Sequence, residues 1–344
     1  MTNSQNEAAT NKSRKNKLII TLLCILGVIL ILITSVFVII FIGNKRLHSG
    51  KMQVSAPDGV DAVENEDYIE YEGKKYVANK NVTSVLFLGI DKENINNEKN
   101  AGSNGQADAI FLACIDTKTG SVKIIPINRD TMADISVYSS NGKYSGTKNT
   151  QICLSYAYGS NAKESCKNVC RDVSRLLCGV NINSYAAIDL EGVSAITDIM
   201  GGVELTSIET IGDFTEGKTV NLKGKKAVSY IQQRGDDVYA ATRRMARQKQ
   251  FLSAFASKAG NQLVTDFSKL SSFYNIFNKY TVTDIDFSKT LYLAKCVMVS
   301  DLGSSIEYLN IDGQAVAGKE HVEFYADNNS IYRTVLDCFY NVIE

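Results

Sequence analysis

Acidic side chains stand at the ends of three short apolar runs in the chain. Asp91 ends the first run, and Asp108 lies just before the second. Arg129 and Asp130 close the third. The runs cover residues 84–90, 109–115 and 121–127. Short apolar runs bounded by turn residues are typical of buried strands, so we expect these side chains to meet at one sheet edge, where α/β sheets usually bind ligands.

The carboxylates of Asp91 and Asp108 have the chemistry of a magnesium site. Both flank the polar loop 92–106, and Mg²⁺ prefers one or two carboxylates together with waters and phosphate oxygens. The alternative is that both aspartates only cap turns or helices.

A second group of polar side chains gathers further along the chain. It contains Arg234, Arg243, Arg244, Arg247 and Gln248. Arg244 and Gln248 are four residues apart and would share one helical face, with Arg243 and Arg247 on a neighbouring face. Arginine forks bind phosphate oxygens in pairs, so the cluster predicts a polyphosphate site that includes Arg234, Arg244, Arg247 and Gln248. A solvated, salt-bridged helix is the alternative.

Several other chemistries lack their usual residues. The chain contains no GxxxxGK[ST] loop, no GxGxxG and no GxSxG, and its only histidines are His48 and His321. A nucleotide-binding fold and a serine or cysteine hydrolase are therefore not supported. The formal net charge is +0, which gives no basic field for nucleic acid.

The elements that would position these residues alternate between strands and helices. A hairpin is expected over 67–78 and a further strand over 184–189. Residues 203–205 are expected to re-enter the sheet. Helical spacing covers 162–178, 190–200, 222–234 and 241–259, with Gly179 as a helix stop. Strands interleaved with helices predict an α/β fold.

The N-terminal part of the chain predicts a membrane anchor. Residues 18–43 carry no charge and are rich in Leu, Ile and Val. This run exceeds the roughly 20 residues that span a bilayer core. We expect a disordered cytoplasmic tail over 1–17, a linker over 44–66 and one globular domain over 67–344. The tail carries slightly more basic residues than the segment that follows the apolar run, and basic residues favour the cytoplasmic side of a membrane.

The cysteines give little sign of a metal site. The chain has eight, of which Cys24 falls in the expected anchor and an odd seven lie beyond it, so they cannot all pair internally. No CxxC pair occurs, which argues against zinc. Cys166 and Cys170 share a helical face with Val173, which favours core packing over the alternative of a disulfide.

The order of these features resembles the LytR–CpsA–Psr family of Gram-positive cell-envelope proteins. The resemblance runs from about Val82 to Ala259 and depends on seven motifs in sequence. They are Leu86-Phe87-Leu88-Gly89-Ile90-Asp91, Ala107-Asp108-Ala109-Ile110, Ile125-Pro126-Ile127-Asn128-Arg129-Asp130, Ser155-Tyr156-Ala157-Tyr158-Gly159, Asp198-Ile199-Met200-Gly201-Gly202-Val203-Glu204, Gly224-Lys225-Lys226-Ala227-Val228-Ser229-Tyr230 and Arg244-Met245-Ala246-Arg247-Gln248.

The resemblance implies a three-layer α-β-α domain with a central mixed β-sheet, lying outside the cell membrane and holding a polyprenyl lipid in an apolar tunnel. It implies a magnesium-dependent phosphotransferase that moves a glycopolymer from undecaprenyl pyrophosphate onto a sugar hydroxyl of peptidoglycan. Asp91 and Asp108 match the family's magnesium-binding carboxylates. Arg129, Arg234, Arg244 and Gln248 match its pyrophosphate-binding residues. Asp91 and Asp130 are candidates for the base that takes the hydroxyl proton.

Three glutamines depart from the family's pattern. Gln106, Gln151 and Gln232 occupy or adjoin positions where the family commonly has Arg or Lys. The Asp usually found three residues before the helix arginine is replaced by Ala241, and Asp236 or Asp237 could substitute. Each lost cation removes a charge-assisted contact worth about 1.5–3 kcal/mol. The sequence therefore allows two alternatives to a transferase: a membrane-tethered protein that binds or regulates through lipid pyrophosphates without turning them over, or a pyrophosphate hydrolase.

Overall fold

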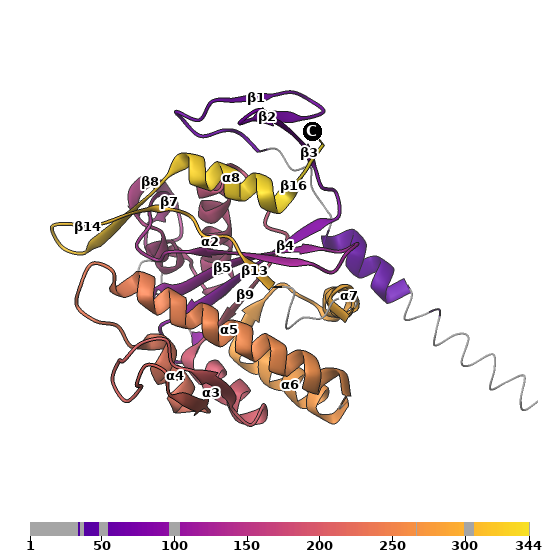
Figure 1. The fold of residues 1–344 in the computed structure, drawn as a ribbon, viewed down its shortest axis with the longest axis vertical. Helices are drawn as coiled ribbons and strands as arrows, with labels where there is room; N and C mark the ends of the chain where they lie inside the picture. Colours follow the sequence, from indigo (N-terminus) through magenta and orange to yellow (C-terminus); the bar gives the residue numbers. More distant parts are fainter. Residues whose placement is uncertain are drawn as a thin grey trace, which may run out of the picture.

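The protein is described here by a computed structural model that covers residues 34, 38–47, 54–95, 104–265, 267–298 and 306–343. Its centre is a six-stranded sheet of mixed direction (Figure 1). The strand order is β12-β9-β4-β5-β6-β13. The strands are β4 (Val82–Ile90), β5 (Ala107–Asp116), β6 (Val122–Ile127), β9 (Ser184–Ile188), β12 (Thr281–Thr283) and β13 (Ile306–Tyr308).

Helices cover both faces of this sheet, so the predicted α/β fold with a central mixed sheet is confirmed (Figure 1). On one side lie α2 (Ala162–Leu176) and α8 (Asn328–Phe339). The helices of the other side are α3 (Leu190–Ile199), α4 (Lys225–Gln232), α5 (Ala240–Thr265), α6 (Phe267–Tyr280) and α7 (Phe287–Met298). The α2 helix ends three residues before Gly179, whose φ of 87° suits the predicted helix stop.

The two faces of the sheet are packed to different degrees. Successive residues of a strand point to opposite faces, so Leu86 and Leu88 of β4 face α2 and α8, where they are almost fully buried. Val85 and Phe87 point to the other face, where Val85 belongs to a cluster that Leu252 of α5 and Leu293 of α7 pack against. Phe87 keeps 39% of its surface exposed although it lies in a central strand. The α5 and α7 layer therefore covers its face of the sheet incompletely.

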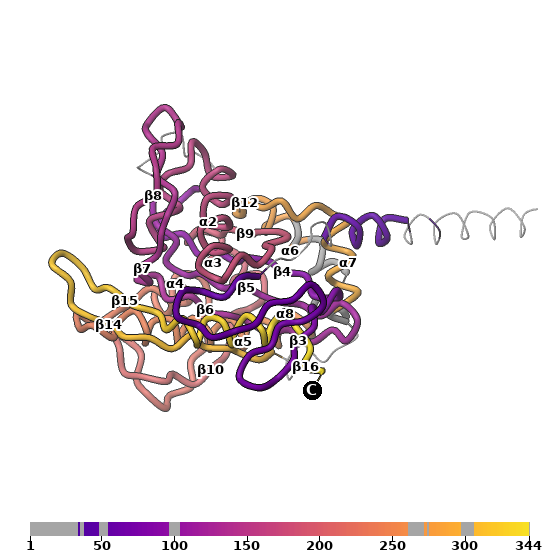
Figure 2. The backbone as a smooth tube through the Cα atoms, turned by 90° about the horizontal axis from the view of Figure 1, so that it is seen from above, coloured from indigo at the N-terminus to yellow at the C-terminus, as the bar shows by residue number. Residues whose placement is uncertain are grey.

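Two hairpins flank the sheet and were not anticipated from the sequence. The first pairs β7 (Met132–Tyr138) with β8 (Tyr144–Gln151) and leads into the 3-10 helix η2 (Ile152–Tyr158). The second pairs β14 (Gly313–Ala317) with β15 (Val322–Ala326). Figure 2 shows both hairpins at the end of the domain opposite the helix formed by residues 38–47.

The expectation that residues 203–205 re-enter the central sheet is wrong. They belong to β10 (Val203–Thr206), which pairs antiparallel with β11 (Thr219–Leu222) in a separate two-stranded sheet. This small sheet packs against α5 and has its own apolar cluster, which includes Phe214 and Tyr230. An apolar alternation of three residues cannot show which sheet a strand joins.

The expected hairpin over 67–78 is confirmed and is part of a four-stranded sheet. The strands, in sheet order, are β1 (Ala62–Glu64), β2 (Ile69–Tyr71), β3 (Lys74–Ala78) and β16 (Tyr340–Val342). Since β1 falls within the expected linker 44–66, part of that segment is folded onto the domain.

The expected tail over 1–17 and nearly all of the expected anchor over 18–43 lie outside the described residues. Within the described part of the chain, no helix combines the length and apolar character needed to cross a membrane. Residues 38–47 form a helix whose last residue, Leu47, is buried against Tyr292 and Cys296 of α7. Arg46 forms an ion pair with Asp286 beside this contact.

Candidate functional site

The antiparallel pairing of β4 with β5 and of β5 with β6 brings the predicted site residues to one sheet edge. Ile90 pairs with Ala107, and Ile110 pairs with Ile127. The register shifts between Gly89 and Ile90, where a Cβ on Gly89 would lie 3.0 Å from that of Ala109. A glycine therefore permits the close strand approach that precedes Asp91. The prediction that these strand ends converge is confirmed.

Asp108 lies between two arginines that come from different elements. Arg129, at the end of β6, contacts one carboxylate oxygen of Asp108. Arg244 of α5 donates from Nη1 to the other oxygen at 2.9 Å. All three side chains are largely buried, so this arrangement joins the helix to the sheet edge and concentrates two guanidinium groups there.

Arg244 retains donor capacity that the folded chain does not use. The residue is 4% exposed, and its Nη2 has no hydrogen-bond partner among the described residues. Burial lowers the pKa of Arg244, against the opposing effect of Asp108. A buried, unpaired guanidinium nitrogen is costly, and an anion entering the site would satisfy it.

Three glutamines each hold one charged member of the site. Gln106 accepts a hydrogen bond from Nη2 of Arg129. Gln151 donates to Asp130 at 2.7 Å, and Gln232 donates to Asp91 at 2.6 Å. These are the glutamines at which the sequence departs from the family's pattern.

Asp130 is 6% exposed and lies beside the Arg129 guanidinium, with 3.4 Å between Oδ1 of Asp130 and Nε of Arg129. Burial raises the pKa of Asp130 above its usual value, and the nearby arginines, Arg129 first, act in the opposite direction. A carboxylate whose pKa is raised is a stronger proton acceptor than an ordinary one. The geometry therefore suits Asp130 to take a proton from a bound hydroxyl.

Cys153 adds a thiol to the same cluster. Nη2 of Arg129 lies 3.3 Å from the Cys153 sulfur, and burial raises the pKa of this thiol to about 11. Cys153 is the second residue of the 3-10 helix η2, which Asp172 of α2 ties to β7 by accepting hydrogen bonds from Ser136 and Ser155. At neutral pH this thiol is neutral and serves as packing beside Arg129.

Arg247, which the sequence predicts to bind phosphate, is engaged within the protein itself. Arg247 is fully buried and forms an ion pair with Glu209. It also donates to the main-chain carbonyls of Tyr230, at 3.0 Å, and Gln233. These contacts fasten α5 to the C-terminal end of α4, so Arg247 is structural. Arg243 reaches the same Glu209 from the neighbouring position, at 3.3 Å.

The remaining predicted residues line two cavities at the sheet edge. Gln248 borders a small cavity of about 40 Å³ that Asp91, Asp108 and Arg244 also line. Arg234 lines a wider polar cavity of about 670 Å³, together with Arg129 and Asp130. Arg234 is exposed, so its guanidinium is available to a ligand in that wider cavity.

Sequence reasoning missed several residues of the wider cavity. Lys148 and Thr150 reach it from β8, and Glu320 and His321 reach it from the turn between β14 and β15. The β14–β15 hairpin lies far from the motifs along the chain. The β7–β8 hairpin directly follows one of them, but no local pattern signals the contact of either hairpin with the site. Asp237, expected as a substitute partner for the helix arginine, pairs with Arg243 rather than Arg244.

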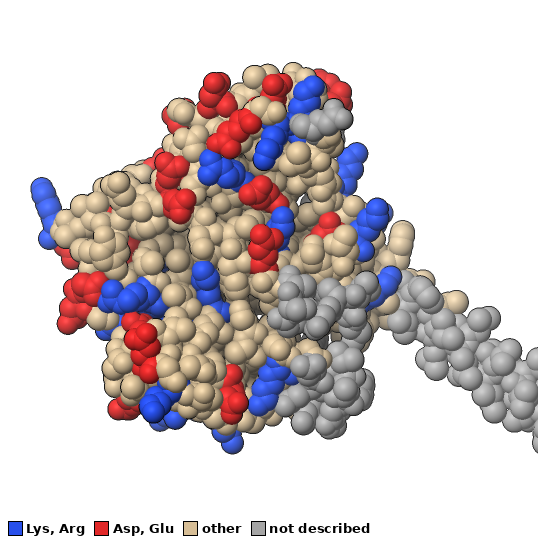
Figure 3. Space-filling view, in the orientation of Figure 1, with Lys and Arg blue, Asp and Glu red and all other residues tan. Residues whose placement is uncertain are grey.

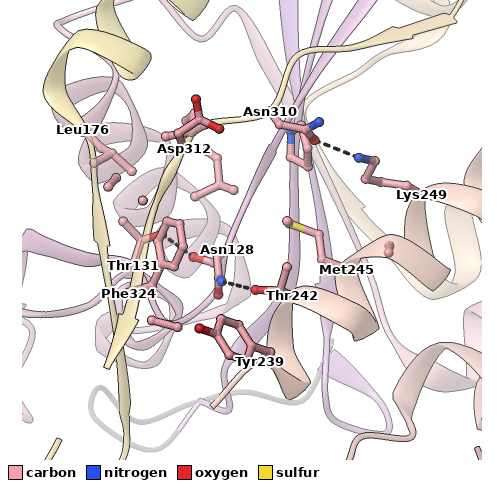
Figure 4. A pocket seen from close by; sticks show the side chains of 17 residues that line it. Asn128, Thr131, Leu176, Tyr239, Thr242, Met245, Lys249, Asn310, Asp312 and Phe324 are labelled. Carbon is pink, nitrogen blue, oxygen red and sulfur yellow. Dashed lines mark hydrogen bonds between the residues drawn. The ribbon is translucent and has the colours of Figure 1, made fainter. Parts of the chain in front are cut away.

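A third cavity of about 360 Å³ lies between the end of β6, α5 and the β14–β15 hairpin (Figure 4). Its lining includes Met245, Tyr239 and Phe324, and Asn128 donates to Thr242 at 3.4 Å across one wall. Its charged lining residues are Lys249 and Asp312, and most of the others are apolar. This cavity therefore suits apolar or weakly polar groups better than the dense charge of a pyrophosphate.

The donor set at the small cavity fits a magnesium ion. Asp91 and Asp108 both line it, and a volume of about 40 Å³ can hold an ion with a few waters, since one water needs about 10–15 Å³. Among the described residues no group of three or more His, Cys, Asp or Glu could hold a metal by itself. Two carboxylates match Mg²⁺ because phosphate and water usually complete its shell.

The core packing predicted for Cys166 and Cys170 is confirmed. Cys166 and Cys178 belong to the main apolar cluster and Cys170 packs against it. None of the cysteines among the described residues is in a disulfide.

Comparison with known proteins gives a family match over most of the chain. The family model described as the LytR_cpsA_psr family matches residues 48–336, which confirms the resemblance drawn from the seven motifs. The chain is 21% identical over 315 residues to the polyisoprenyl-teichoic acid–peptidoglycan teichoic acid transferase TagV of Bacillus subtilis, covering 89% of this chain and 73% of TagV.

Two further relatives match over shorter lengths. TagU of Bacillus licheniformis, a transferase with the same descriptive name, is 23% identical over 215 residues, covering 61% of this chain and 62% of TagU. Biofilm regulatory protein A of Streptococcus mutans is 25% identical over 259 residues, covering 72% of this chain and 61% of the relative. The matches thus span less than two thirds of either relative.

Solved structures share the fold. The crystal structure of B. subtilis TagV superposes with a TM-score of 0.60 at 20% identity, covering 76% of this chain and 96% of that one. A structure of TagT bound to LI-WTA gives a TM-score of 0.56 at 18% identity, covering 83% and 98%.

Proposed function

The chain belongs to the LytR_cpsA_psr family, and from this premise we propose that it is a phosphotransferase that moves a glycopolymer from polyprenyl pyrophosphate to a sugar hydroxyl of peptidoglycan. The relatives named as transferases act on polyisoprenyl-linked teichoic acid and peptidoglycan. The proposal extends their donor and acceptor classes to this chain.

One observation carries the proposal: the buried, unpartnered Nη2 of Arg244 beside Arg129 at the sheet edge. A pyrophosphate has dense negative charge that repels an incoming nucleophile. Fixed guanidinium groups neutralise that charge and stabilise the transferring phosphoryl group. Arg234, which lines the adjoining polar cavity, would add a third cation.

The proposed reaction exchanges one phosphorus–oxygen bond for another. The hydroxyl oxygen of the acceptor sugar bonds to the phosphorus that carries the glycan. The bond from that phosphorus to the bridging oxygen breaks, and polyprenyl phosphate leaves with the electron pair. The hydroxyl proton passes to a carboxylate.

Asp130 is the better candidate for that carboxylate, and Asp91 for metal binding. Asp130 is buried, its pKa is raised, and it lines the wider cavity where an acceptor sugar has room. Asp91 is exposed and lines the small cavity with Asp108. Magnesium held by Asp91 and Asp108 would supply further neutralisation of the pyrophosphate charge.

The incompletely covered face of the sheet supports a lipid-linked donor. Phe87 and Phe111 pair across β4 and β5 on this face, and Leu252 of α5 and Leu293 of α7 pack against the cluster that contains Phe111. Apolar surface left open in a central strand is unusual unless something covers it. The polyprenyl chain of the donor would lie against this face.

The same face lies near the end of the proposed anchor. Leu293 contributes both to this face and to the cluster around Leu47. We therefore propose that residues 18–43 span the cell membrane with the tail inside and the domain outside. A donor that stays in the bilayer would then meet the domain at high effective concentration.

The test uses the full-length chain with a short lipid-pyrophosphate-linked glycan, magnesium and peptidoglycan oligomers. We expect glycan coupled to the oligomer, detected by mass spectrometry, and loss of coupling in Asp130→Asn and Arg244→Met. Released phosphoglycan without coupling would identify a hydrolase instead. No turnover in the native chain, despite measurable donor binding, would refute both enzymatic functions.

A second candidate is a membrane-tethered protein that binds lipid pyrophosphates without turning them over. The three glutamines at the site favour it, because each stands where a cation would strengthen phosphate binding. One relative, Biofilm regulatory protein A, is named for a regulatory role. The coupling assay separates this candidate from the transferase.

A further inference from the structure

We propose that the third cavity, of about 360 Å³ between α5 and the β14–β15 hairpin, binds one neutral sugar ring of the acceptor glycan, next to the ring that reacts. This inference rests on the proposed function, because that function supplies the acceptor glycan. It assigns a ligand to a cavity that the transfer reaction itself does not use.

The third cavity adjoins the wider polar cavity along two segments of the chain. In the segment after β6, Arg129 and Asp130 line the wider cavity, whereas Asn128 and Thr131 line the third. The start of α5 likewise contributes residues to both cavities. A glycan whose reacting sugar lies beside Asp130 therefore has its neighbouring sugar close to the third cavity.

Strand β15 joins the third cavity to the proposed proton acceptor. Phe324, which lines the third cavity, donates its main-chain N–H to the carbonyl of Asp130 at 2.9 Å. Val322, which lines the wider cavity, accepts a hydrogen bond from Gln151 at 2.8 Å. A Cβ on Gly313 would lie 2.6 Å from Cζ of Phe324, so the glycine lets this ring pack close to the main chain. These contacts hold the Phe324 ring in place relative to Asp130.

The lining of the third cavity has the composition of a sugar site. Tyr239 and Phe324 provide aromatic rings, against which the apolar C–H face of a sugar can pack. Asn310 and Asp312 lie on the opposite side of the cavity from Tyr239 (Figure 4) and can bond to sugar hydroxyls. Ligand pockets of about 300–1,000 Å³ commonly combine a mostly apolar lining with a few convergent polar groups.

Three polar groups of this lining are left available to a ligand. The Asp312 carboxylate, the Tyr239 hydroxyl and Nδ2 of Asn310 have no hydrogen-bond partner in the part of the chain that the structure describes. Lys249 donates to Oδ1 of Asn310 at 2.8 Å, which orients the amide and leaves its donor end free. Acceptor and donor groups are thus both present, as a ring of hydroxyls requires.

The charges around the cavity favour a neutral ligand. Its two charged lining residues, Lys249 and Asp312, are of opposite sign. The face of the molecule in Figure 3 has acidic and basic side chains interspersed, with no broad patch of either sign. Such a surface has no field that would draw an anion or a cation into the cavity, and a sugar ring needs none.

The first test measures coupling by the full-length chain in mild detergent. The donor is a short lipid-pyrophosphate-linked glycan, and the acceptor is a peptidoglycan glycan chain of four sugars without stem peptides. Tyr239→Ala removes a ring that is 58% exposed and should raise KM for the acceptor by about tenfold, the scale of one lost aromatic contact. Asp312→Ala should raise the same KM. In both variants kcat and KM for the donor should stay within about twofold of the native values.

The second test measures binding without turnover, and so separates this inference from the proposed function. Saturation-transfer NMR with the four-sugar chain and no donor should detect binding to the native chain, and Tyr239→Ala should weaken it about tenfold. Tyr239→Phe keeps the ring and should lose less affinity than Tyr239→Ala. Tyr325→Ala removes a tyrosine of similar exposure from β15 that does not line the cavity, and should change neither measurement. Circular dichroism checks that each variant is folded.

The outcomes distinguish the two proposals. Absence of binding to the native chain, or unchanged acceptor affinity in both Tyr239→Ala and Asp312→Ala, would overturn the sugar site and leave the proposed function standing. A raised KM for the donor in place of the acceptor would also overturn it, because the cavity would then hold the donor glycan. Binding that depends on Tyr239 in a native chain that couples no glycan would support the sugar site and overturn the proposed transfer.

Discussion

Mutation of two arginines three residues apart on α5 should affect two different properties of the protein, its stability and its ligand binding. Arg247 is fully buried and bound to Glu209 and to two carbonyls at the end of α4. Arg244 faces the sheet edge and has an unused donor. We therefore expect Arg247→Met to reduce stability without affecting ligand binding, and Arg244→Met to reduce ligand binding.

The size of the first effect follows from the contacts. Removing one partner of a buried ion pair costs about 3–5 kcal/mol. Glu209 has a side chain that is 20% exposed and keeps Arg243 at 3.3 Å, so the loss should fall near the lower end, at about 3 kcal/mol. With a urea slope of about 3 kcal/mol per molar, the unfolding midpoint should fall by about 1 M.

The assay follows urea unfolding by circular dichroism, because the chain contains no tryptophan. Urea carries no charge and leaves the ion pairs unscreened. Pyrophosphate affinity is then measured without urea, where both variants are folded. Arg247→Met should bind within about twofold of the native chain, whereas Arg244→Met should bind about 10–100-fold more weakly, as expected for 1.5–3 kcal/mol. A stable Arg247→Met that loses binding would refute the structural role of Arg247.

The remaining predictions concern the proton acceptor, the open face and the thiols. Burial raises the pKa of Asp130 above the usual 3.8, so kcat/KM should rise with pH through an acid limb above that value, and Asp130→Asn should abolish the limb in pH–rate profiles. Phe87→Ala should cost about 1–2 kcal/mol in urea unfolding, because Phe87 is 39% exposed, whereas the buried Leu86→Ala should cost about 2–5 kcal/mol; equal losses would contradict an open face. Phe87→Asp should weaken binding of a prenyl pyrophosphate but not of inorganic pyrophosphate. Since burial raises the pKa of Cys153 to about 11, alkylation at pH 8 should be slow until the chain is unfolded, and rapid labelling of the native protein would disprove its burial.

Local patterns in the sequence predicted the parts of the fold that depend on near neighbours. The apolar runs ending at Asp91 and Arg129 gave the strands and their shared edge, because alternation and turn residues act over a few positions. Gly179 marked a helix end for the same reason. The hairpin β14–β15 could not be predicted as part of the site, because its contact with Asp130 and Gln151 joins residues far apart in the chain.

The sequence by itself determined which residue types gather at the site, and the tertiary structure decided which of them face it. Arg244 and Arg247 have the same chemistry and differ by roughly 60° around α5, at 3.6 residues per turn. The packing of α5 against α4 and Glu209 fixes that rotation, so one arginine reaches Asp108 and the other is buried among carbonyls. The tertiary structure also changed the interpretation of the three glutamines. In the sequence they were lost cations, and in the fold each one holds a charged residue of the site.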